Sequence, residues 1–331
     1  MTNRPTMNDV ARAAGVSLKT VSRVVNGETT VAPDLAARVR AAVESLEYRP
    51  HLGASLLRRN DRRTRTIGVL LEDVSNSFSA ALHRAVEDEA RARGIHVLTG
   101  SLDEDPSRER ELAAAFAQRQ ADGLILAPTG DDQSYLAGLG GMPVVFVDRA
   151  ASHADGDTVV ATNTAGAAGA VRHLIAHGHE RIAYLGDLRR LTTARDRHRG
   201  YLRAMGRRPG PAVHDLHDSR AAERAALGVL RGPHPPTAIF AAQNLITIGV
   251  VRALRHLGLA RQIGLVGFDD FPLADLLEPA VTVVAQDPAR MGRTAAAALF
   301  ERIDGRDGPP REIRIATTLI PRGSGEITGS W

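Results

Sequence analysis

A short stretch near the amino end combines small hydroxyl side chains with two long basic ones. At helical spacing, residues 17–25 place three valines on one face and present a different set on the other: Ser17, Leu18, Lys19, Thr20, Ser22 and Arg23. Hydroxyls bind phosphate oxygens, and lysine and arginine reach base edges in a major groove. Asn26, at the end of the stretch, is a further candidate contact. The pattern predicts a helix that binds double-stranded nucleic acid.

The distribution of charge favours the same kind of partner. Residues 1–65 hold 12 Lys+Arg against 6 Asp+Glu, whereas the remaining residues hold 30 against 32. The basic excess is therefore confined to the first fifth of the chain, which indicates a polyanionic partner for that segment. Lys19 is the only lysine, so the other 41 basic residues are arginines.

Cysteine is absent from all 331 residues, which excludes disulfides, thiol catalysis, iron–sulfur clusters and cysteine-bound zinc. No stretch approaches the ~18 apolar residues of a membrane span, and residues 1–8 are polar with no apolar run behind them. We expect a cytoplasmic protein.

Three short helical patterns must position the basic face. Thr6 to Asp9 form a helix-start pattern, and the apolar spacing that follows ends at Gly15. A second helix starts at Ser17, and its inner face holds Val21, Val24 and Val25. A third runs from about residue 33 to 46. Only three residues separate the first two helices, so the sequence predicts a helix-turn-helix unit.

Beyond a charged linker at residues 58–63 the pattern changes class. Near-continuous apolar runs predict strands at 67–71, 95–98, 123–127, 144–147, 181–185, 238–242 and 263–268. Amphipathic stretches predict helices at 77–93, 107–120, 165–177, 198–206, 219–230 and 245–257. This alternation is typical of parallel sheets covered on both faces by helices. We expect two α/β lobes of similar plan.

Polar pairs follow several of these strands. They are Glu72-Asp73, Asp148-Arg149, Gln243-Asn244 and Asp269-Asp270. Open α/β sheets bind ligands at the carboxyl ends of their strands. A cleft between the lobes would therefore hold one small molecule that is hydroxyl-rich or charged.

The segment "MNDVARAAGVSLKTVSRVVNG" at 7–27 resembles the headpiece of the LacI/GalR family of bacterial transcriptional regulators. The resemblance extends to "VFVDR" at 145–149, "TARDRHRGY" at 193–201 and "LVGFDDFPLADLLEPAVTVVAQD" at 265–287. It implies an all-α helix-turn-helix headpiece at 1–50, a hinge helix and linker at 51–65, and an effector-binding and dimerisation domain at 66–331. That domain would be periplasmic-binding-protein-like, with two doubly wound parallel sheets. Its N-lobe would span about 66–161 and 291–316, and its C-lobe about 162–290 and 317–331.

The resemblance also implies a hinge helix at 51–59 that folds on operator DNA. Leu57 of each subunit would enter the minor groove at a pyrimidine–purine step, which unstacks at low cost, and Arg58 would contact phosphate. The alternative for Leu57 is packing against Leu52 or Leu56. A dimer on a pseudo-palindromic site is expected, since one recognition helix reads few base pairs. The chain ends without a leucine heptad, which favours a dimer over a tetramer.

For the effector, the resemblance assigns six residues: Phe78, Ser79, Asp148, Arg197, Gln243 and Asp269. Arg197 would grip hydroxyls or a carboxylate, and the two aspartates would accept sugar hydroxyls. Two departures from the family pattern leave the effector's identity open: "NSFS" replaces a Pro-Phe-Phe run, and Gln243-Asn244 replaces Asn-Asp. The alternatives are a surface ion pair of Arg197 with Asp196 or Glu180, and turn or cap chemistry for the aspartates.

The resulting prediction is a dimeric, allosteric DNA-binding repressor with a sugar or sugar-derivative effector. A sugar-binding protein without regulatory DNA binding is the alternative. No nucleotide-binding glycine pattern follows the strand at 67–71 and no nucleophile elbow is present, so an enzyme is disfavoured. His177 and His179 resemble a metal pair but have no third ligand nearby, so no metal or cofactor is expected. The operator, the regulated genes and the direction of the effector's action stay open.

Overall fold

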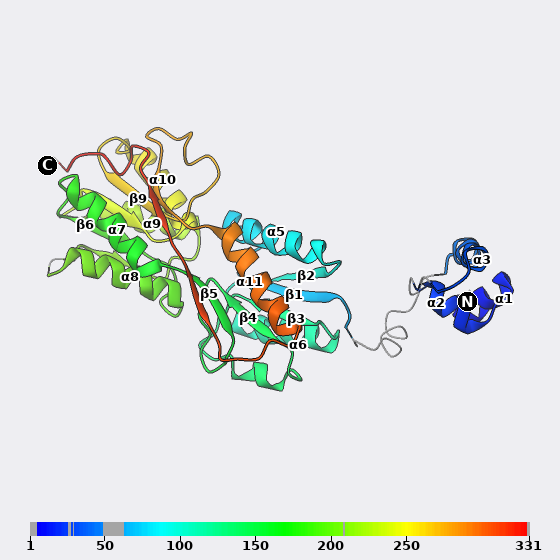
Figure 1. Cartoon of the computed structure of the whole chain (residues 1–331). Coiled ribbons are helices and arrows are strands. Elements are labelled where there is room, and N and C mark those ends of the chain that lie inside the picture. Colours follow the sequence, from blue (N-terminus) through cyan, green and yellow to red (C-terminus); the bar gives the residue numbers. More distant parts are fainter. Residues whose placement is uncertain (1–4, 26–27, 29, 49–62, 208, 330–331) are drawn as a thin grey trace. The chain divides into compact units, whose positions relative to one another are not determined.

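The computed structural model describes residues 5–25, 28, 30–48, 63–207 and 209–329. The chain divides into two compact units, Met1–Thr64 and Arg65–Trp331 (Figure 1). Three predicted contact residues, Asn26, Leu57 and Arg58, lie outside the described residues.

The amino-terminal unit contains three helices: α1 (Met7–Ala14), α2 (Leu18–Val25) and α3 (Pro33–Ser45). A capping box starts α1, because the Thr6 hydroxyl accepts from the Asp9 N–H while the Asp9 carboxylate accepts from the Thr6 N–H. Gly15 ends α1 with φ 62°, and the guanidinium of Arg38 donates to the Ala14 carbonyl at 2.6 Å. The predicted helix-turn-helix is confirmed.

A small apolar core holds these helices together. One valine from each helix is fully buried, namely Val10, Val21 and Val39, and Tyr48 covers the core from beyond α3. This packing fixes which side of α2 faces inward and leaves its polar side in solvent.

The N-lobe of the second unit is built on a parallel sheet of strand order β11-β5-β4-β3-β1-β2. Its strands are β1 (Thr66–Leu71), β2 (His96–Ser101), β3 (Gly123–Leu126), β4 (Val144–Val147), β5 (Asp157–Ala161) and β11 (Glu312–Ile315). Helices α5 (Ser77–Ala92) and α11 (Pro288–Ile303) cover one face. Helix α6 (Pro106–Gln118) and the 3-10 helix η1 (Ser134–Gly138) cover the other.

The C-lobe repeats this plan with strand order β12-β10-β9-β8-β6-β7. Its strands are β6 (Ile182–Leu185), β7 (Ala212–Val213), β8 (Ala238–Ala241), β9 (Gly264–Phe268), β10 (Thr282–Ala285) and β12 (Thr318–Ile320). Helices α9 (Ser219–Leu230) and α10 (Asn244–Leu257) cover one face, and α7 (Asn163–Ala176) and α8 (Thr192–Met205) cover the other.

The chain passes between the lobes at β5–α7, at β10–α11 and at β11–β12 (Figure 1). The two-lobed α/β fold is confirmed, with two corrections. Strand β12 pairs antiparallel with β10, so the C-lobe sheet is not wholly parallel. Helix α8 starts at Thr192 rather than at residue 198, because its polar first turn lacks the apolar stripe used to locate it. Within the described residues, every helix is too short or too polar to cross a membrane.

Candidate functional sites

The outward side of α2 carries the residues predicted to contact nucleic acid. Leu18 is 41% exposed, and Ser17 and Lys19 are also exposed. Thr20, Ser22 and Arg23 are half-buried on the same helix, while Val21 is fully buried against the other helices. The structure therefore brings six of the nine predicted contacts together, five on α2 and the sixth at Ser17, which directly precedes it.

Several of these side chains already have local partners. The Ser17 hydroxyl accepts from the Thr20 N–H at 3.2 Å and lies 2.9 Å from the Thr20 hydroxyl, so it caps α2. The Nε of Arg23 lies 3.5 Å from a Glu28 carboxylate, and both side chains are nearly half exposed. An ion pair this exposed contributes little free energy and leaves Arg23 available to a polyanion.

In the second unit, the two lobes contact each other through a pair of asparagines. Asn76 caps α5 by accepting from the Phe78 N–H at 3.1 Å. Its amide donates to the Asn244 oxygen at 3.3 Å, and the Asn244 amide donates back to Asn76 at 2.9 Å. Because both side chains are buried, this exchange joins the amino ends of α5 and α10 and closes the lobes at that point.

Arg190 makes a second contact between the lobes. It follows β6 in the C-lobe, and its guanidinium donates to the N-lobe carbonyl of Thr129 at 2.9 Å and to the carbonyl of Glu104. The Glu104 carboxylate lies 3.5 Å away. These partners are 61 and 86 residues from Arg190, and sequence reasoning missed both Arg190 and Glu104 because no local pattern links them.

A cluster of charges lies in the N-lobe beside this contact. The buried Arg149 guanidinium donates to Glu104 at 2.6 Å and lies 3.6 Å from Glu72 and 3.4 Å from Asp148. Burial raises the pKa of Glu72 to about 8, against the opposing pull of Arg149 and with the support of neighbouring carboxylates. The cluster therefore holds more carboxylates than its guanidiniums can fully stabilise.

Arg197 is buried and anchors the C-lobe. Its Nε donates to Asn163 at 2.8 Å, and its Nη1 donates to the Ala242 carbonyl at 2.9 Å and to Asp269 at 3.2 Å. Its Cζ also lies 3.9 Å from the centre of the Phe268 ring. The alternative of a surface ion pair with Asp196 or Glu180 is wrong, because Asp196 binds Arg199 and Arg197 is 5% exposed.

Asp148 and Asp269 occupy equivalent places in the two lobes. Each follows a strand with positive φ, 66° and 69°, which is the turn geometry offered as their alternative role. Their side chains nevertheless point inward. Asp269 accepts from Gln286 at 2.6 Å and from Arg197, whereas Asp148 Oδ1 is buried with no hydrogen-bond partner among the described residues. Burial raises the pKa of Asp148.

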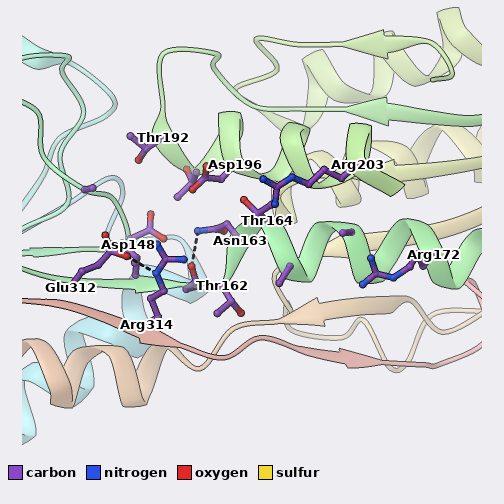
Figure 2. A pocket seen from close by; sticks show the side chains of 16 residues that line it. Asp148, Thr162, Asn163, Thr164, Arg172, Thr192, Asp196, Arg203, Glu312 and Arg314 are labelled. Atoms are coloured by element: carbon purple, nitrogen blue, oxygen red, sulfur yellow. Dashed lines mark hydrogen bonds and ion pairs between the residues drawn. The ribbon is translucent and has the colours of Figure 1, made fainter. Parts of the chain in front are cut away.

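Two pockets open where the lobes meet. One encloses about 460 Å³ and is lined by Asp148, Thr162, Asn163, Thr192, Thr193 and Arg314, among others (Figure 2). Another encloses about 340 Å³ and is lined by Phe78, Asp269, Phe271 and Gln286, among others. Three of the six predicted effector residues thus line these pockets: Asp148 lines the first, and Phe78 and Asp269 line the second.

The remaining predicted effector residues line neither pocket. The Gln243 side chain caps α10 by accepting from the Leu245 and Ile246 N–H groups at 2.9 and 3.3 Å. Ser79 is 4% exposed within α5. Arg197 touches the first pocket only through Asn163. Their contact with an effector stays a prediction.

The histidine pair at 177 and 179 has structural partners. His179 Nδ1 lies 3.0 Å from the Thr237 hydroxyl, and Nε2 lies 2.8 Å from the Ile327 carbonyl. It therefore fixes the carboxyl-terminal segment against the C-lobe. In the part of the chain that the structure describes, His, Asp and Glu side chains form no group that could hold a metal ion.

Comparison with known proteins identifies the family to which this chain belongs. Residues 6–51 match the family of bacterial regulatory proteins of the lacI type, and residues 171–325 match a periplasmic binding protein-like domain. The transcriptional regulator PtxS of Pseudomonas plecoglossicida is 34% identical over 98% of this chain and 96% of its own length. The chain belongs to the LacI family.

Other members show the same correspondence over their full length. The ribose operon repressor of Escherichia coli strain K12 is 31% identical over 96% of this chain and 99% of its own. The lac repressor dimer bound to operator and the anti-inducer ONPF superposes with a TM-score of 0.86 at 25% identity, covering 98% of this chain and 99% of that one. This LacI-family protein is therefore a DNA-binding transcriptional regulator and not an enzyme.

Proposed function

We propose that this LacI-family protein is a repressor that binds a pseudo-palindromic operator as a dimer. A small molecule in the cleft between the lobes controls it. The observation that carries the proposal is the exposed basic and hydroxyl face of α2, joined in one chain to a two-lobed domain whose lobes contact each other through hydrogen bonds.

The DNA contacts are assigned to the outward residues of α2, with Lys19 and Arg23 reading bases and the hydroxyls holding phosphates. The proposal extends to Asn26, Leu57 and Arg58 on the strength of the family pattern alone. Residues 1–50 form the headpiece in this proposal, 51–65 the hinge segment and 66–331 the effector domain.

Control would act through the contacts between the lobes. A ligand that fits the closed cleft stabilises the state in which Asn76 holds Asn244 and Arg190 holds Thr129. Since the headpieces precede the N-lobes, a shift in closure changes their fit to the two half-sites. Effector and operator then alter each other's affinity by the same factor, typically by ~1–3 kcal/mol.

A sugar or sugar derivative is the proposed effector. Support comes from the hydrogen-bonding side chains at the cleft and from a relative, the regulator CelR, solved as a complex with cellobiose. That structure is 28% identical over 97% of this chain and 100% of its own, with a TM-score of 0.70.

The test is selection of bound sequences by the full chain from a random duplex library. The proposal predicts enrichment of an inverted repeat, and affinity for it that falls linearly with salt on logarithmic axes. Lys19→Gln removes one positive charge from the proposed DNA-contacting face of α2. Arg12→Gln removes one positive charge from the neighbouring helix α1 and is the matched control. The alternative, a sugar-binding protein without regulatory DNA binding, predicts no enriched sequence.

A further inference from the structure

One carboxylate of the N-lobe is buried without a basic partner. Glu109, on α6, is 1% exposed, and among the described residues it forms no ion pair. Burying a charged group costs free energy unless hydrogen bonds replace its water. Within the described part of the chain, the donors that replace it all come from one segment, residues 129–135, which follows β3. The carboxylate therefore binds this segment rather than a basic side chain.

The segment folds around the two oxygens of that carboxylate. Thr129 donates its N–H and its hydroxyl to Oε2, at 2.5 and 2.9 Å. Gly130 donates its N–H to the same oxygen at 3.3 Å. The side chains of Gln133 and Tyr135 donate to Oε1 at 3.2 and 2.8 Å. A single side chain of α6 thus fixes the path of the segment.

The peptide group between Thr129 and Gly130 joins this arrangement to the C-lobe. Its N–H donates to Glu109, and its carbonyl accepts from the guanidinium of Arg190 at 2.9 Å. A peptide group has a dipole, so a negative charge at its N–H and a positive charge at its C=O stabilise the same orientation. Hydrogen bonds in such a chain also polarise and strengthen one another. The carboxylate and the guanidinium therefore hold one peptide group from opposite sides.

The other hydrogen bonds of this region hold different groups. The Pro128 carbonyl accepts from Arg149 at 3.2 Å. Gln133 donates its N–H to the Ser152 carbonyl at 2.9 Å, and its side-chain oxygen accepts from the Ser152 N–H at 2.8 Å. These bonds attach the segment to the residues that follow β4, within the N-lobe. Glu109 is the group that binds the N–H of the peptide whose carbonyl reaches the C-lobe.

We propose that Glu109 is a positioning residue for closure of the lobes, because it orients the Thr129–Gly130 peptide with its carbonyl toward Arg190. The inference rests on the proposed function, in which closure transmits effector binding to the headpieces. Glu109 itself lines neither of the two pockets where the lobes meet. Loss of its charge frees the peptide to turn and withdraws an acceptor from Arg190. The closed state then becomes less populated although Arg190 is intact.

Glu109→Gln tests this role, since it keeps the size of the side chain and removes the charge. Closure is followed in the full chain, without DNA or added small molecule, by energy transfer between dyes at Gln118→Cys on α6 and Arg224→Cys on α9. We expect Glu109→Gln to shift the equilibrium toward the open state by about three- to tenfold.

Asp157→Asn is the matched control for loss of a buried carboxylate. Asp157 lies in the same lobe as Glu109, and its two arginine partners also belong to that lobe. The control should lower the stability of the lobe and leave the energy transfer as in the parent chain. Equal transfer in Glu109→Gln and Asp157→Asn would overturn the proposal.

A double-mutant cycle separates positioning from a general loss of stability. If Glu109 acts through the acceptor of Arg190, then Glu109→Gln should shift closure by less than about twofold once Arg190→Ala is present. Arg189→Ala, which removes a charge from a pair inside the C-lobe, is the control background. There the shift of about three- to tenfold should persist. A shift of the same size in both backgrounds would mean that Glu109 acts on the N-lobe as a whole, against the proposal.

The reverse direction needs no substitution at Glu109. Because coupling is reciprocal, Arg190→Ala should weaken the bond from the Gly130 N–H to Glu109. Hydrogen exchange of residues 129–135, measured by mass spectrometry, should be about threefold or more faster in Arg190→Ala than in Arg189→Ala. Equal exchange rates would contradict the coupling. All these measurements are made without operator, so a chain that closes as expected but does not repress would refute only the proposed function.

Discussion

Arg190 offers a direct way to disturb the closure of the lobes. Arg190→Ala removes the donors to the Thr129 and Glu104 carbonyls and the charge beside the Glu104 carboxylate. Hydrogen bonds from charged groups contribute about 1.5–3 kcal/mol each, but this side chain is 31% exposed and solvent replaces part of the loss. We therefore expect about 1–2 kcal/mol less stabilisation of the closed state, or roughly a 5–30-fold shift toward the open one.

The shift can be followed by energy transfer between dyes on the two lobes. Because the chain has no cysteine, Gln118→Cys on α6 and Arg224→Cys on α9 give two unique labelling positions. Arg189→Ala is the matched control: it removes the same charge one residue away, from an exposed pair with Asp215 inside the C-lobe. The reasoning predicts lower transfer in Arg190→Ala alone. Identical transfer in both variants would refute it.

Three further perturbations test separate parts of the molecule. Arg23→Ala should reduce the preference for the correct base at one symmetric operator position by about 1–3 kcal/mol. Ser22→Ala should instead lower the affinity for all duplex sequences by the same factor. The same pattern of affinities across sequences in both variants would contradict these roles. Asp157→Asn should lower the free energy of unfolding by about 3 kcal/mol at neutral pH, as measured with denaturant. The reason is that the buried Asp157 carboxylate binds Arg302 at 2.8 Å and Arg311 at 2.6 Å. Although burial opposes it, those bonds hold the pKa of Asp157 below its usual value, so the loss should vanish as pH falls through the acid range. Burial raises the pKa of Glu72 to about 8, so this carboxyl takes up a proton when the chain folds. The free energy of unfolding of the parent should therefore decrease as pH rises from about 4.5 to 8. Glu72→Gln should remove this decrease, which denaturant unfolding at several pH values measures.

Local patterns were enough to predict the amino-terminal unit. The capping box at Thr6, the stop at Gly15 and the valine face of α2 all involve residues within a few positions of one another. The strands β1, β3, β4, β6, β8 and β9 were predicted for a similar reason, since their apolar runs are continuous.

Long-range structure was beyond the reach of these patterns. The short strands β10 and β12 pair across more than thirty residues, and only that pairing shows β12 to be antiparallel. The contact of Arg190 with Glu104 has the same origin, because neither residue type signals its partner. Gln243 shows a different kind of limit: a polar side chain after a strand predicts a ligand contact, and the same position lets its oxygen cap α10, a role that the sequence did not predict.

The central claim is that two headpieces bind duplex DNA as a symmetric pair. Fluorescence anisotropy of the full chain with a selected operator, and with the same duplex after one half-site is scrambled, measures this directly. The account predicts that scrambling one half-site lowers affinity to near that of random duplex. Equal affinity for the intact and half-scrambled duplexes would contradict it.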